Sequence, residues 1–475
     1  MTLYRYPQIL KADRNRVILQ FFYLSEKRKL NVLRKIALLP DKKVSKLLEQ
    51  IFIEFEHRHY NLEEQLLENF SKVERYLTNK NKLSLERKLL IGAYFSKEYS
   101  VESAALFNPS LISHPDQDGS KDGKLKFILS LRATGEGHVS SIEFRTGIID
   151  KDYNIKIEPT PGLTELPKLV KEYIYSKHDL KRATKYFDEL NEELFNQLPE
   201  RFTRDDLNNF LSERGNMFSK NPVTLRSLTN ILDYIDANYE FEFKGDKALS
   251  SYVIFPQSKS ESGGMEDLRL VKFNDDGNFH YYGTYTANNG YSFKVQMLET
   301  DDFNTYRVKT LHGSAVKDKG MALFPRKINN KYFMISRQDG EDLSIMSSKS
   351  LDIWEDFKLL QAPDQPWEFI QFGNCGSPIE TKDGWLLITH AVGPFRKYVI
   401  AASLLDLDDP TKVIARLREP LISPDDSERE GYVPNVVYSC GSLIHHQQLI
   451  IPYAMSDSMT GFARIPVNKL LNKMQ

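Results

Sequence analysis

The sequence contains few cysteines, no excess of one charge sign and no long apolar run. Its 475 residues include 2 Cys, too few for a disulfide framework or for a zinc site built from four cysteines. Lys and Arg number 64 against 65 Asp and Glu, so the formal net charge is -1 and no overall field attracts nucleic acid. Accordingly, we expect no nucleic-acid partner.

Signals for membranes and secretion are also missing. No apolar stretch approaches the roughly 18 residues of a membrane span. The N-terminal MTLYRYP lacks the apolar core of a secretory signal. We therefore expect no membrane partner and a cytoplasmic location. A chain of 475 residues is long enough to form more than one structural unit.

The first 97 residues have the apolar spacing of helices. Asn61 has Glu64 three residues on, which is the arrangement of a capping box, and a further segment spans Leu85 to Tyr94. We expect a helical domain over residues 1–97 that serves packing or assembly into a homo-oligomer. One helical stripe in it consists of Val44, Leu47, Leu48, Ile51, Phe52 and Phe55.

After this region, short apolar and aromatic runs alternate with pairs of turn residues. Such pairs between alternating runs predict β-hairpins. The pairs are Asp122-Gly123, Asp276-Gly277, Asn329-Asn330, Asp383-Gly384 and His446-Gln447.

The spacing of these turns indicates the architecture. The last four pairs recur about every 50–60 residues, close to the repeat of propeller blades. The longer first gap contains helical spacing at Leu225, Leu228, Leu232 and Ile235. We predict a mainly β fold: a five-bladed β-propeller catalytic domain over residues 98–475, with a helical insertion at about 161–239 between its first two blades. A β-sandwich with a helical insert is the structural alternative.

The stretch Gly263 to Arg269, GGMEDLR, is the most distinctive in the chain. It places two carboxylates and a guanidinium beside a flexible turn. In an extended strand Asp267 and Arg269 share one face, while Glu266 and Leu268 share the other. An Asp on the wall of a sugar pocket can act as a general acid, although an arginine on the same face would lower its pKa.

Six short motifs, including this one, follow one another along the predicted strands. They are Asn108-Pro109-Ser110; Gly264 to Arg269 with Tyr285-Thr286-Ala287; Leu323 to Ile328; Gly376 to Trp385 with His390; Val433 to Val437; and Asp457. In this order they resemble glycoside hydrolase family 130, the inverting β-mannoside phosphorylases and β-mannosidases built on a five-bladed propeller. The family's usual Glu-Asp-Pro-Arg reads Glu-Asp-Leu-Arg here, which keeps every chemical group.

The resemblance implies roles for individual residues. The family's proton donor is the Asp of this motif, which points to Asp267, and in phosphorylases the proton passes through a sugar hydroxyl. Lys319 matches the Lys of the phosphate site, Lys294 stands where phosphorylases carry an Arg, and Asp457 matches a sugar-contacting position. Neither the proton relay nor attack at an anomeric carbon needs a Lewis acid, so we expect no metal and no cofactor.

A second reacting group decides between hydrolysis and phosphorolysis. A hydrolase needs a carboxylate base that activates water, whereas a phosphorylase needs a cationic pocket for phosphate. The Lys at position 294 loses the bidentate fork of an Arg. The loop after Arg337 carries acids where phosphorylases usually have Arg and Pro. Glu341 is the first candidate base, with Glu428 and Glu430 as alternatives.

Further polar side chains are candidates for contacts with sugar hydroxyls or rings. Several lie in the loop from Arg132 to Ser141, where Gly135 and Gly137 permit unusual backbone angles. The candidate substrate contacts are Asn108, Arg132, Glu136, His138, Ser141, Arg145, Arg269, Tyr285, Lys294, Lys319, Arg337, His390 and Asp457; the catalytic candidates are Asp267, Glu341 and Glu430.

These observations favour an inverting, exo-acting glycosidase that releases mannose from β-mannosides, most of all β-1,2-mannosides. Its partner would be a mannose-containing oligosaccharide. One alternative is a β-mannoside phosphorylase, which would also bind inorganic phosphate and release mannose 1-phosphate. Another is a carbohydrate-binding propeller without catalytic activity.

Overall fold

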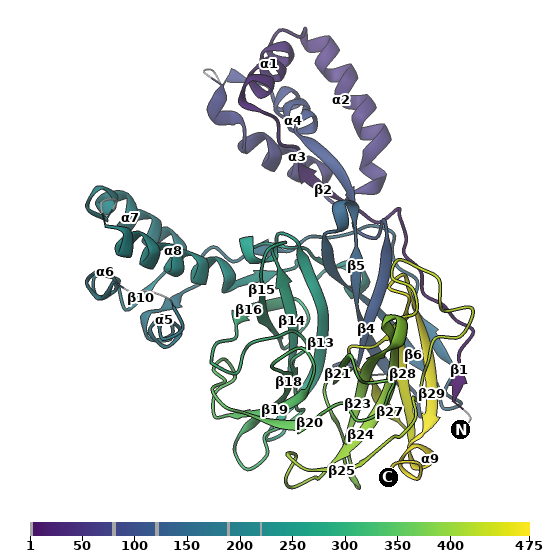
Figure 1. Ribbon diagram of the computed structural model, residues 1–475. Helices are drawn as coiled ribbons and strands as arrows, with labels where there is room; N and C mark the ends of the chain where they lie inside the picture. Colours follow the sequence, from purple (N-terminus) through teal and green to yellow (C-terminus); the bar gives the residue numbers. More distant parts are fainter. Residues whose placement is uncertain (1–2, 78–81, 119–122, 188–190, 219–220) are drawn as a thin grey trace.

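The computed structural model describes residues 3–77, 82–118, 123–187, 191–218 and 221–475. A body of β-strands carries two separate groups of helices, one above it and one to its left in Figure 1. The prediction of a mainly β fold is confirmed. Within the described part of the chain, no helix has the length and apolar character needed to cross a membrane.

The N-terminal helices pack around a small core of their own. The predicted apolar stripe lies on α2, where Val44 and Leu48 are buried. Strands β2 (Val17–Phe21) and β3 (Ser96–Ser100) pair antiparallel and connect the helices to the strand body. The helices are α1 (Glu26–Ala37), α2 (Asp41–Phe55), α3 (Leu62–Ser71) and α4 (Leu85–Tyr94).

The capping box predicted at Asn61 is wrong. Asn61 precedes α3 in the left-handed conformation, with φ 52°, and its side chain makes no capping hydrogen bond. A capping side chain requires an extended backbone at that position. Glu64 instead pairs with Lys168 at 2.5 Å and with Lys244 at 3.3 Å. This carboxylate therefore links α3 to the strand body.

The strands form five consecutive antiparallel groups in the described residues. The first two groups are joined by a single parallel pair, Gly264 with Ser140. The first group consists of β4 (Ala105–Ser113), β5 (Leu125–Thr134), β6 (Ser140–Ile149) and β7 (Ile155–Ile157), and the second of β13 (Gly264–Asp275), β14 (Asn278–Asn288), β15 (Phe293–Thr300) and β16 (Thr305–Thr310). The third consists of β17 (Ala322–Leu323), β18 (Tyr332–Arg337), β19 (Leu343–Ser348) and β20 (Phe357–Gln361), and the fourth of β21 (Gln371–Asn374), β22 (Ile379–Thr381), β23 (Gly384–Gly393), β24 (Lys397–Leu405) and β25 (Val413–Arg416). The last consists of β26 (Val437–Tyr438), β27 (Leu443–His445), β28 (Gln448–Met455) and β29 (Met459–Pro466).

Turn chemistry explains the hairpins within these groups. Asp276-Gly277, Asn329-Asn330 and His446-Gln447 have positive φ at both positions, as a type I′ turn requires. They connect β13 to β14, precede β18, and connect β27 to β28, so these predicted hairpins are confirmed. Residue 122 of the predicted pair Asp122-Gly123 lies outside the described residues.

The last strand group lies beside the first. Cys440 N donates to the Pro109 carbonyl at 2.8 Å, and Leu106 N donates to the Ser458 carbonyl at 3.2 Å. Strand β1 (Tyr4–Arg5) pairs with β29, so the beginning of the chain completes the last group rather than joining the helices.

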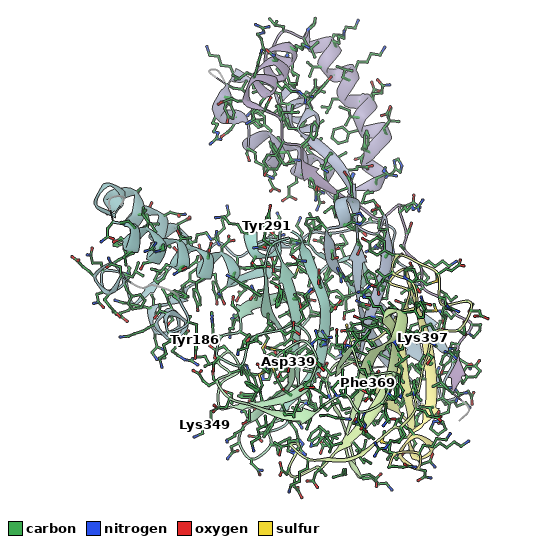
Figure 2. All side chains as sticks on the ribbon, in the orientation of Figure 1. Tyr186, Tyr291, Asp339, Lys349, Phe369 and Lys397 are labelled. Carbon is green, nitrogen blue, oxygen red and sulfur yellow. The ribbon has the colours of Figure 1, made fainter. Side chains whose placement is uncertain are left out.

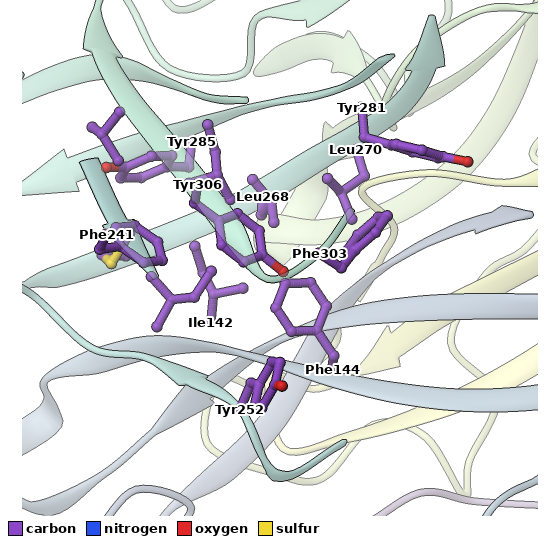
Figure 3. Packing of buried hydrophobic residues seen from close by; sticks show 14 of the residues in the cluster. Ile142, Phe144, Phe241, Tyr252, Leu268, Leu270, Tyr281, Tyr285, Phe303 and Tyr306 are labelled. Carbon is purple, nitrogen blue, oxygen red and sulfur yellow. The ribbon is translucent and has the colours of Figure 1, made fainter. Parts of the chain in front are cut away.

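Aromatic packing fills the space between the first two groups (Figure 3). Phe144 of β6 stacks on Tyr306 of β16, with ring centroids 6.4 Å apart. Leu268 and Leu270 of β13 enter the same core, where each is 3% exposed. Apolar burial of this extent is the main stabilising contribution to such a core, and it fixes the position of β13.

A group of helices lies between the first and second strand groups along the chain, and we call it the helical insertion. Its own core includes Leu180, Phe195 and Ile231. Arg182 forms an ion pair with Asp352 at 3.1 Å and so docks the insertion on the third strand group. The helices are α5 (Lys177–Thr184), α6 (Glu192–Asn196), α7 (Arg204–Phe218) and α8 (Pro222–Ala237), and β11 (Tyr239–Glu242) then pairs with β16.

A buried ion-pair cluster joins the N-terminal segment to the first strand group. Arg16 Nε lies 2.8 Å from Glu102 Oε1, and Arg16 Nη2 lies 2.6 Å from Glu143 Oε2. Arg145 contacts both carboxylates. Burial and the neighbouring charge of Glu143 raise the pKa of Glu102 to about 8. The two arginines therefore offset the cost of burying these two carboxyl groups.

Replacing Arg16 by Met should lower the free energy of unfolding by about 3–5 kcal/mol, because the substitution removes one of the two cations that pair with the buried Glu102 and Glu143. Urea denaturation measures this change. Lys412→Met is the matched control, because that side chain is 68% exposed and its pair with Asp409 should contribute at most about 1 kcal/mol. Equal losses in the two variants would contradict the role of the cluster.

Candidate active site

A polar cavity of about 240 Å³ lies where the first strands of the groups converge. Strands β4, β13, β21 and β26 contribute to it, together with the loop before β17. Its lining residues are Asn108, Arg132, Glu266, Asp267, Arg269, Lys319, Gly320, Arg337, Gln371, Gly373, Asn374, His390, Arg396, Tyr398, Val436, Tyr438 and Asp457.

Three of the residues that line the cavity have a left-handed backbone conformation, which directs their side chains into it. Asn108, Asp267 and Asp457 have φ values of 48°, 59° and 49°. Two of them lie in β-bulges, because the register shifts between Phe107 and Ser110 in β4 and between Glu266 and Arg269 in β13. Bulges redirect side chains, and strained φ values are frequent in active sites.

The bulge in β13 overturns one prediction. Regular alternation would place Glu266 with Leu268, on the face opposite Asp267 and Arg269. Instead Glu266, Asp267 and Arg269 all line the cavity, while Leu268 packs in the core. The extra residue changes the phase of the strand, so three charged groups reach one pocket.

Asp267 is held as a carboxylate. Asn108 Nδ2 donates to Asp267 Oδ1 at 2.7 Å, and Arg132 Nη1 lies 3.4 Å from the same oxygen. Burial alone would raise the pKa of Asp267, but the guanidinium groups of Arg132 and Arg269 and the Asn108 hydrogen bond lower it below its ordinary value. Asp267 is therefore ionised at neutral pH in the unliganded pocket.

Arg269 is anchored below the cavity. Its Nε donates to Asn374 Oδ1 at 3.2 Å and its Nη1 donates to the Asp267 carbonyl at 3.1 Å. A third hydrogen bond goes to the hydroxyl of Tyr438. The side chain thus bonds the backbone of Asp267 rather than its carboxylate, and it fixes the bulge from inside the protein.

Cations outnumber carboxyl groups in this pocket. Five of the lining side chains are Arg or Lys, and three are Asp or Glu. Lys319 pairs with Glu266 at 3.0 Å, and Arg337 pairs with Asp318 at 2.6 Å. Arg396 has a left-handed backbone, with φ 54°. An excess of positive charge within one cavity suits an anionic ligand.

His390 is a neutral hydrogen-bonding group. Its Nδ1 lies 2.9 Å from the Asn374 carbonyl, which can only accept, so Nδ1 carries the proton. Burial and the charges of Arg337 and Arg269 lower the pKa of His390 to about 3. The Gln371 amide nitrogen lies 3.3 Å from Nε2. Nε2 is therefore the acceptor nitrogen of the ring, with the Gln371 amide as its donor.

Asp457 differs from Asp267 in its proton affinity. Burial and the charge of Asp267 raise the pKa of Asp457 to about 6, against the opposing effects of Arg132 and Arg396. One pocket thus contains a carboxyl group with a lowered pKa and another with a raised pKa. Such a pair is typical of sites that move protons.

The predicted catalytic bases lie elsewhere. Glu341 and Glu430 are exposed and do not line the cavity. Glu428 is buried, but it bonds the hydroxyl of Tyr453 at 2.6 Å and pairs with Arg5 at 3.1 Å. The prediction that these loops supply a base is therefore corrected, because none of the three side chains lines the cavity.

Three predicted substrate contacts are buried outside the cavity. Arg145 belongs to the ion-pair cluster beneath the first strand group. Tyr285 donates to Glu261 at 2.5 Å from inside the aromatic core. Ser141 is 1% exposed and does not line the cavity. Buried strand faces use these side chains, which corrects the prediction that they contact a sugar.

Three more predicted contacts lie on other surfaces. Glu136 pairs with Lys97 at 3.4 Å. His138 is exposed, and its Nδ1 lies 3.0 Å from the hydroxyl of Tyr432. Lys294 lines a separate cavity beside the helical insertion. None of the three lines the polar cavity, so these predictions are corrected as well.

The structure brings together eight of the predicted residues, and several others were missed. Glu266 lies within a motif that the sequence offers, but strand alternation excluded it. The remaining missed residues belong to segments that are distant in sequence from Asp267, and they lie outside the quoted motifs, although some are close to one. The predicted residues in the cavity are Asn108, Arg132, Asp267, Arg269, Lys319, Arg337, His390 and Asp457; the missed ones are Glu266, Gln371, Asn374, Arg396, Tyr398 and Tyr438.

The lining groups do not form a metal site. Among the residues that the structure describes, no group of three or more His, Cys, Asp or Glu side chains is placed to hold an ion. The cavity instead offers an anion-binding wall of guanidinium and ammonium groups, hydrogen-bond partners for hydroxyls, and two carboxyl groups of different proton affinity. These features suit a reaction between a sugar and an anion.

Comparisons with known proteins agree with this chemistry. A family model described as beta-1,4-mannooligosaccharide phosphorylase, of glycoside hydrolase family 130, matches residues 238–475. A 1,2-beta-oligomannan phosphorylase of Thermoanaerobacter sp. (strain X514) is 38% identical over 226 residues, which cover 45% of this chain and 72% of that protein. A beta-1,2-mannobiose phosphorylase of Listeria innocua serovar 6a is 27% identical over 239 residues, covering 47% and 63%.

A solved structure is also similar. The beta-1,2-mannobiose phosphorylase from Listeria innocua, in complex with beta-1,2-mannobiose, aligns with a TM-score of 0.47 and 19% identity. The alignment covers 79% of this chain and 92% of that one. On the family model and the sequence relatives, the chain belongs to glycoside hydrolase family 130.

Proposed function

We propose that this protein is a β-mannoside phosphorylase. The observation that carries the proposal is the cavity wall, where five cations accompany three carboxyl groups and the glutamates predicted as bases are absent from the lining. In the reaction, a phosphate oxygen attacks the anomeric carbon of a terminal β-mannoside. The bond from that carbon to the leaving oxygen breaks, the leaving oxygen takes a proton, and α-mannose 1-phosphate forms with inversion.

The proposed substrates are β-1,2-linked mannosides. Support comes from the relatives described as 1,2-beta-oligomannan phosphorylase and beta-1,2-mannobiose phosphorylase. A relative described as beta-1,4-mannooligosaccharide phosphorylase is less similar, at 31% identity over 198 residues. Hydrolysis, the reaction favoured by the sequence alone, has less support, because the glutamates predicted as its base do not line the cavity and Glu266 and Asp267 are paired with cations. Asp457 is the lining carboxyl group without an ion pair in the described residues, and we assign it to sugar binding.

Each reacting group has a proposed position. Asp267 is the proton donor and acts through a sugar hydroxyl. Lys319 and Arg337 hold phosphate, because both are cations at the edge of the cavity and are paired with single carboxylates that phosphate can replace. Asn108 and Asp457 bind sugar hydroxyls from the opposite wall.

Phosphate itself would convert Asp267 into an acid. In the unliganded pocket, nearby cations keep this carboxyl group ionised, which is the wrong state for donating a proton. A phosphate dianion bound to Lys319 and Arg337, in the same cavity, adds negative charge and offsets the effect of these cations. The pKa of Asp267 then rises toward the range of a general acid. Proton transfer is thereby tied to the presence of the second substrate.

The proposal includes an architecture. The five strand groups would form the blades of a propeller, with residues 1–97 as a helical domain apart from β1. Support comes from the hydrogen bonds between the first and last groups, such as Cys440 N to the Pro109 carbonyl at 2.8 Å. Strand β1 on β29 would then close the ring with the start of the chain. The cavity would lie on the axis of such a propeller.

Turnover of β-1,2-mannobiose should depend on inorganic phosphate, because the anion is the nucleophile. Chromatography of the products with and without phosphate measures this dependence, and mannose 1-phosphate should appear with one equivalent of mannose. Release of mannose at the same rate without phosphate would show a hydrolase. Absence of turnover on any β-mannoside would support a binding protein without activity.

Replacing Arg337 by Met should raise the KM for phosphate by roughly tenfold to a hundredfold, the effect of losing one charge-assisted hydrogen bond. Initial rates at varied phosphate concentration measure this change. Arg326→Met is the matched control, because that arginine pairs with Glu380 at 2.7 Å outside the cavity. An equal KM for phosphate in both variants would show that Arg337 does not bind phosphate.

Replacing Asp267 by Asn should abolish turnover and also lower the pKa of Asp457 from about 6. The sign follows from charge: the Asp267 carboxylate disfavours a second negative charge, so its removal makes Asp457 easier to ionise. Carboxyl ¹³C NMR titration of labelled protein detects the shift, and circular dichroism checks the fold. Full activity, or an Asp457 that still titrates near 6, would refute the pairing of these carboxyl groups.

A further inference from the structure

A second polar cavity lies between the helical insertion and the strand body. Its volume is about 290 Å³. Helix α8 and the residues after α5 form one wall, and β15, β16 and the loop before β17 form the other. Tyr186, labelled in Figure 2, lies at this junction. The insertion lies outside the stretches that carry the family motifs, so the cavity is a feature of this chain rather than of the reaction site.

A neutral histidine forms the centre of the cavity wall. The His312 ring lies between Tyr186 and Tyr234, with centroids 5.9 Å from each and interplanar angles of 10° and 23°. Burial lowers the pKa of His312 to about 4, and the charge of Lys294 contributes. Its Nε2 is buried and has no hydrogen-bond partner among the described residues. Burying a polar atom without a hydrogen-bond partner costs free energy, unless a ligand or a water molecule supplies the partner.

The backbone holds this histidine in place. His312 N donates to the Asp352 carbonyl at 2.8 Å, and Trp354 N donates to the His312 carbonyl at 2.8 Å. The next residue, Gly313, has φ 129°, and a Cβ there would lie 1.8 Å from the Trp354 carbonyl oxygen. The stacked ring is therefore part of a rigid wall.

Two lysines face the same cavity. Lys294 and Lys317 line it, and neither forms an ion pair with any residue that the structure describes. The position of Lys294 follows from β15, where the neighbouring residue on the same strand face, Gln296, donates to the Ala237 carbonyl of α8 at 3.2 Å. Lys294 is therefore on the side of the strand that meets the insertion. Asp233 lies on the opposite wall and likewise has no ion pair in the described residues.

We propose that this cavity binds a phosphorylated monosaccharide. Two ammonium groups and an imidazole nitrogen match a phosphate monoester, for which lysine is a common partner. The Asp233 carboxylate can accept hydrogen bonds from sugar hydroxyls. Tyr186 and Tyr234 each stack one ring face on His312. Less aromatic surface of the wall is therefore left for stacking on the planar base of a nucleotide. These features favour a sugar phosphate over a nucleotide.

The loop before β17 connects the two cavities. Lys317 lines the second cavity, whereas Asp318 accepts from Arg337 at 2.6 Å and Lys319 donates to Glu266 at 3.0 Å in the first. A ligand that draws Lys317 toward the insertion would move the neighbouring residues that contact the phosphate-binding groups. If the proposed function holds, occupancy of the second cavity changes the KM for phosphate at the first.

The test is calorimetric titration with mannose 6-phosphate, which needs no turnover and so stands apart from the proposed reaction. The wild-type protein should bind it, and the double variant Lys294→Met, Lys317→Met should bind about a hundredfold more weakly, tenfold for each lost contact. Lys349→Met is the matched control, because this lysine is exposed and does not line the cavity.

Several outcomes would overturn the proposal. These are an absence of binding to the wild-type protein, equal binding by the double variant, or inorganic phosphate binding to the Arg337→Met variant as tightly as the sugar phosphate does. Binding that is lost in Arg337→Met but kept in the double variant would assign the ligand to the first cavity. Lys317 is exposed, so the single variant Lys317→Met keeps the test available if the double variant does not fold.

Discussion

The left-handed backbone at Asp267 is the constraint on which the arrangement of the pocket depends. It adds one residue to β13 without a partner on β14, and so turns Glu266, Asp267 and Arg269 toward one cavity. The strain is held from two sides, by the Asn108 hydrogen bond at 2.7 Å and by Arg269, which donates to the Asp267 carbonyl at 3.1 Å. Below the bulge, Leu268 packs in the aromatic core and prevents the strand from returning to regular alternation.

Charge balance connects this geometry to the proposed reaction. The cations that hold Asp267 ionised are close to those that would bind phosphate, so the unliganded pocket is not yet an acid catalyst. Phosphate would supply both the nucleophile and the change in proton affinity. The sequence predicted a mannosidase because acids follow Arg337 and because Lys294 stands where phosphorylases carry an arginine. In the structure those acids do not line the cavity, and Lys294 faces the insertion. Arg396 adds a cation to the cavity that no motif predicts.

Local patterns predicted much of the fold and about half of the site. Turn pairs such as Asn329-Asn330 define hairpins because few residue types tolerate positive φ, and the stripe on α2 reports its buried face. Motifs located Asp267, Lys319 and Asp457, since each is read from a short stretch. The bulge could not be predicted, because no residue type marks it when Leu268 replaces the usual proline. Tyr438 and Arg396 could not be predicted either, since they meet Asp267 only through the convergence of distant strands.

The helical insertion gives the chain a second polar cavity, and a single residue, Asp318, separates Lys317 of that cavity from Lys319 of the first. The central claim concerns the first cavity: phosphate bound to Lys319 and Arg337 offsets the effect of the cations that keep Asp267 ionised. Carboxyl ¹³C NMR titration of Asp267, with and without saturating phosphate, tests it most directly. The account predicts that the pKa of Asp267 lies below its ordinary value in the unliganded protein and rises when phosphate binds. An Asp267 pKa that phosphate leaves unchanged would contradict it.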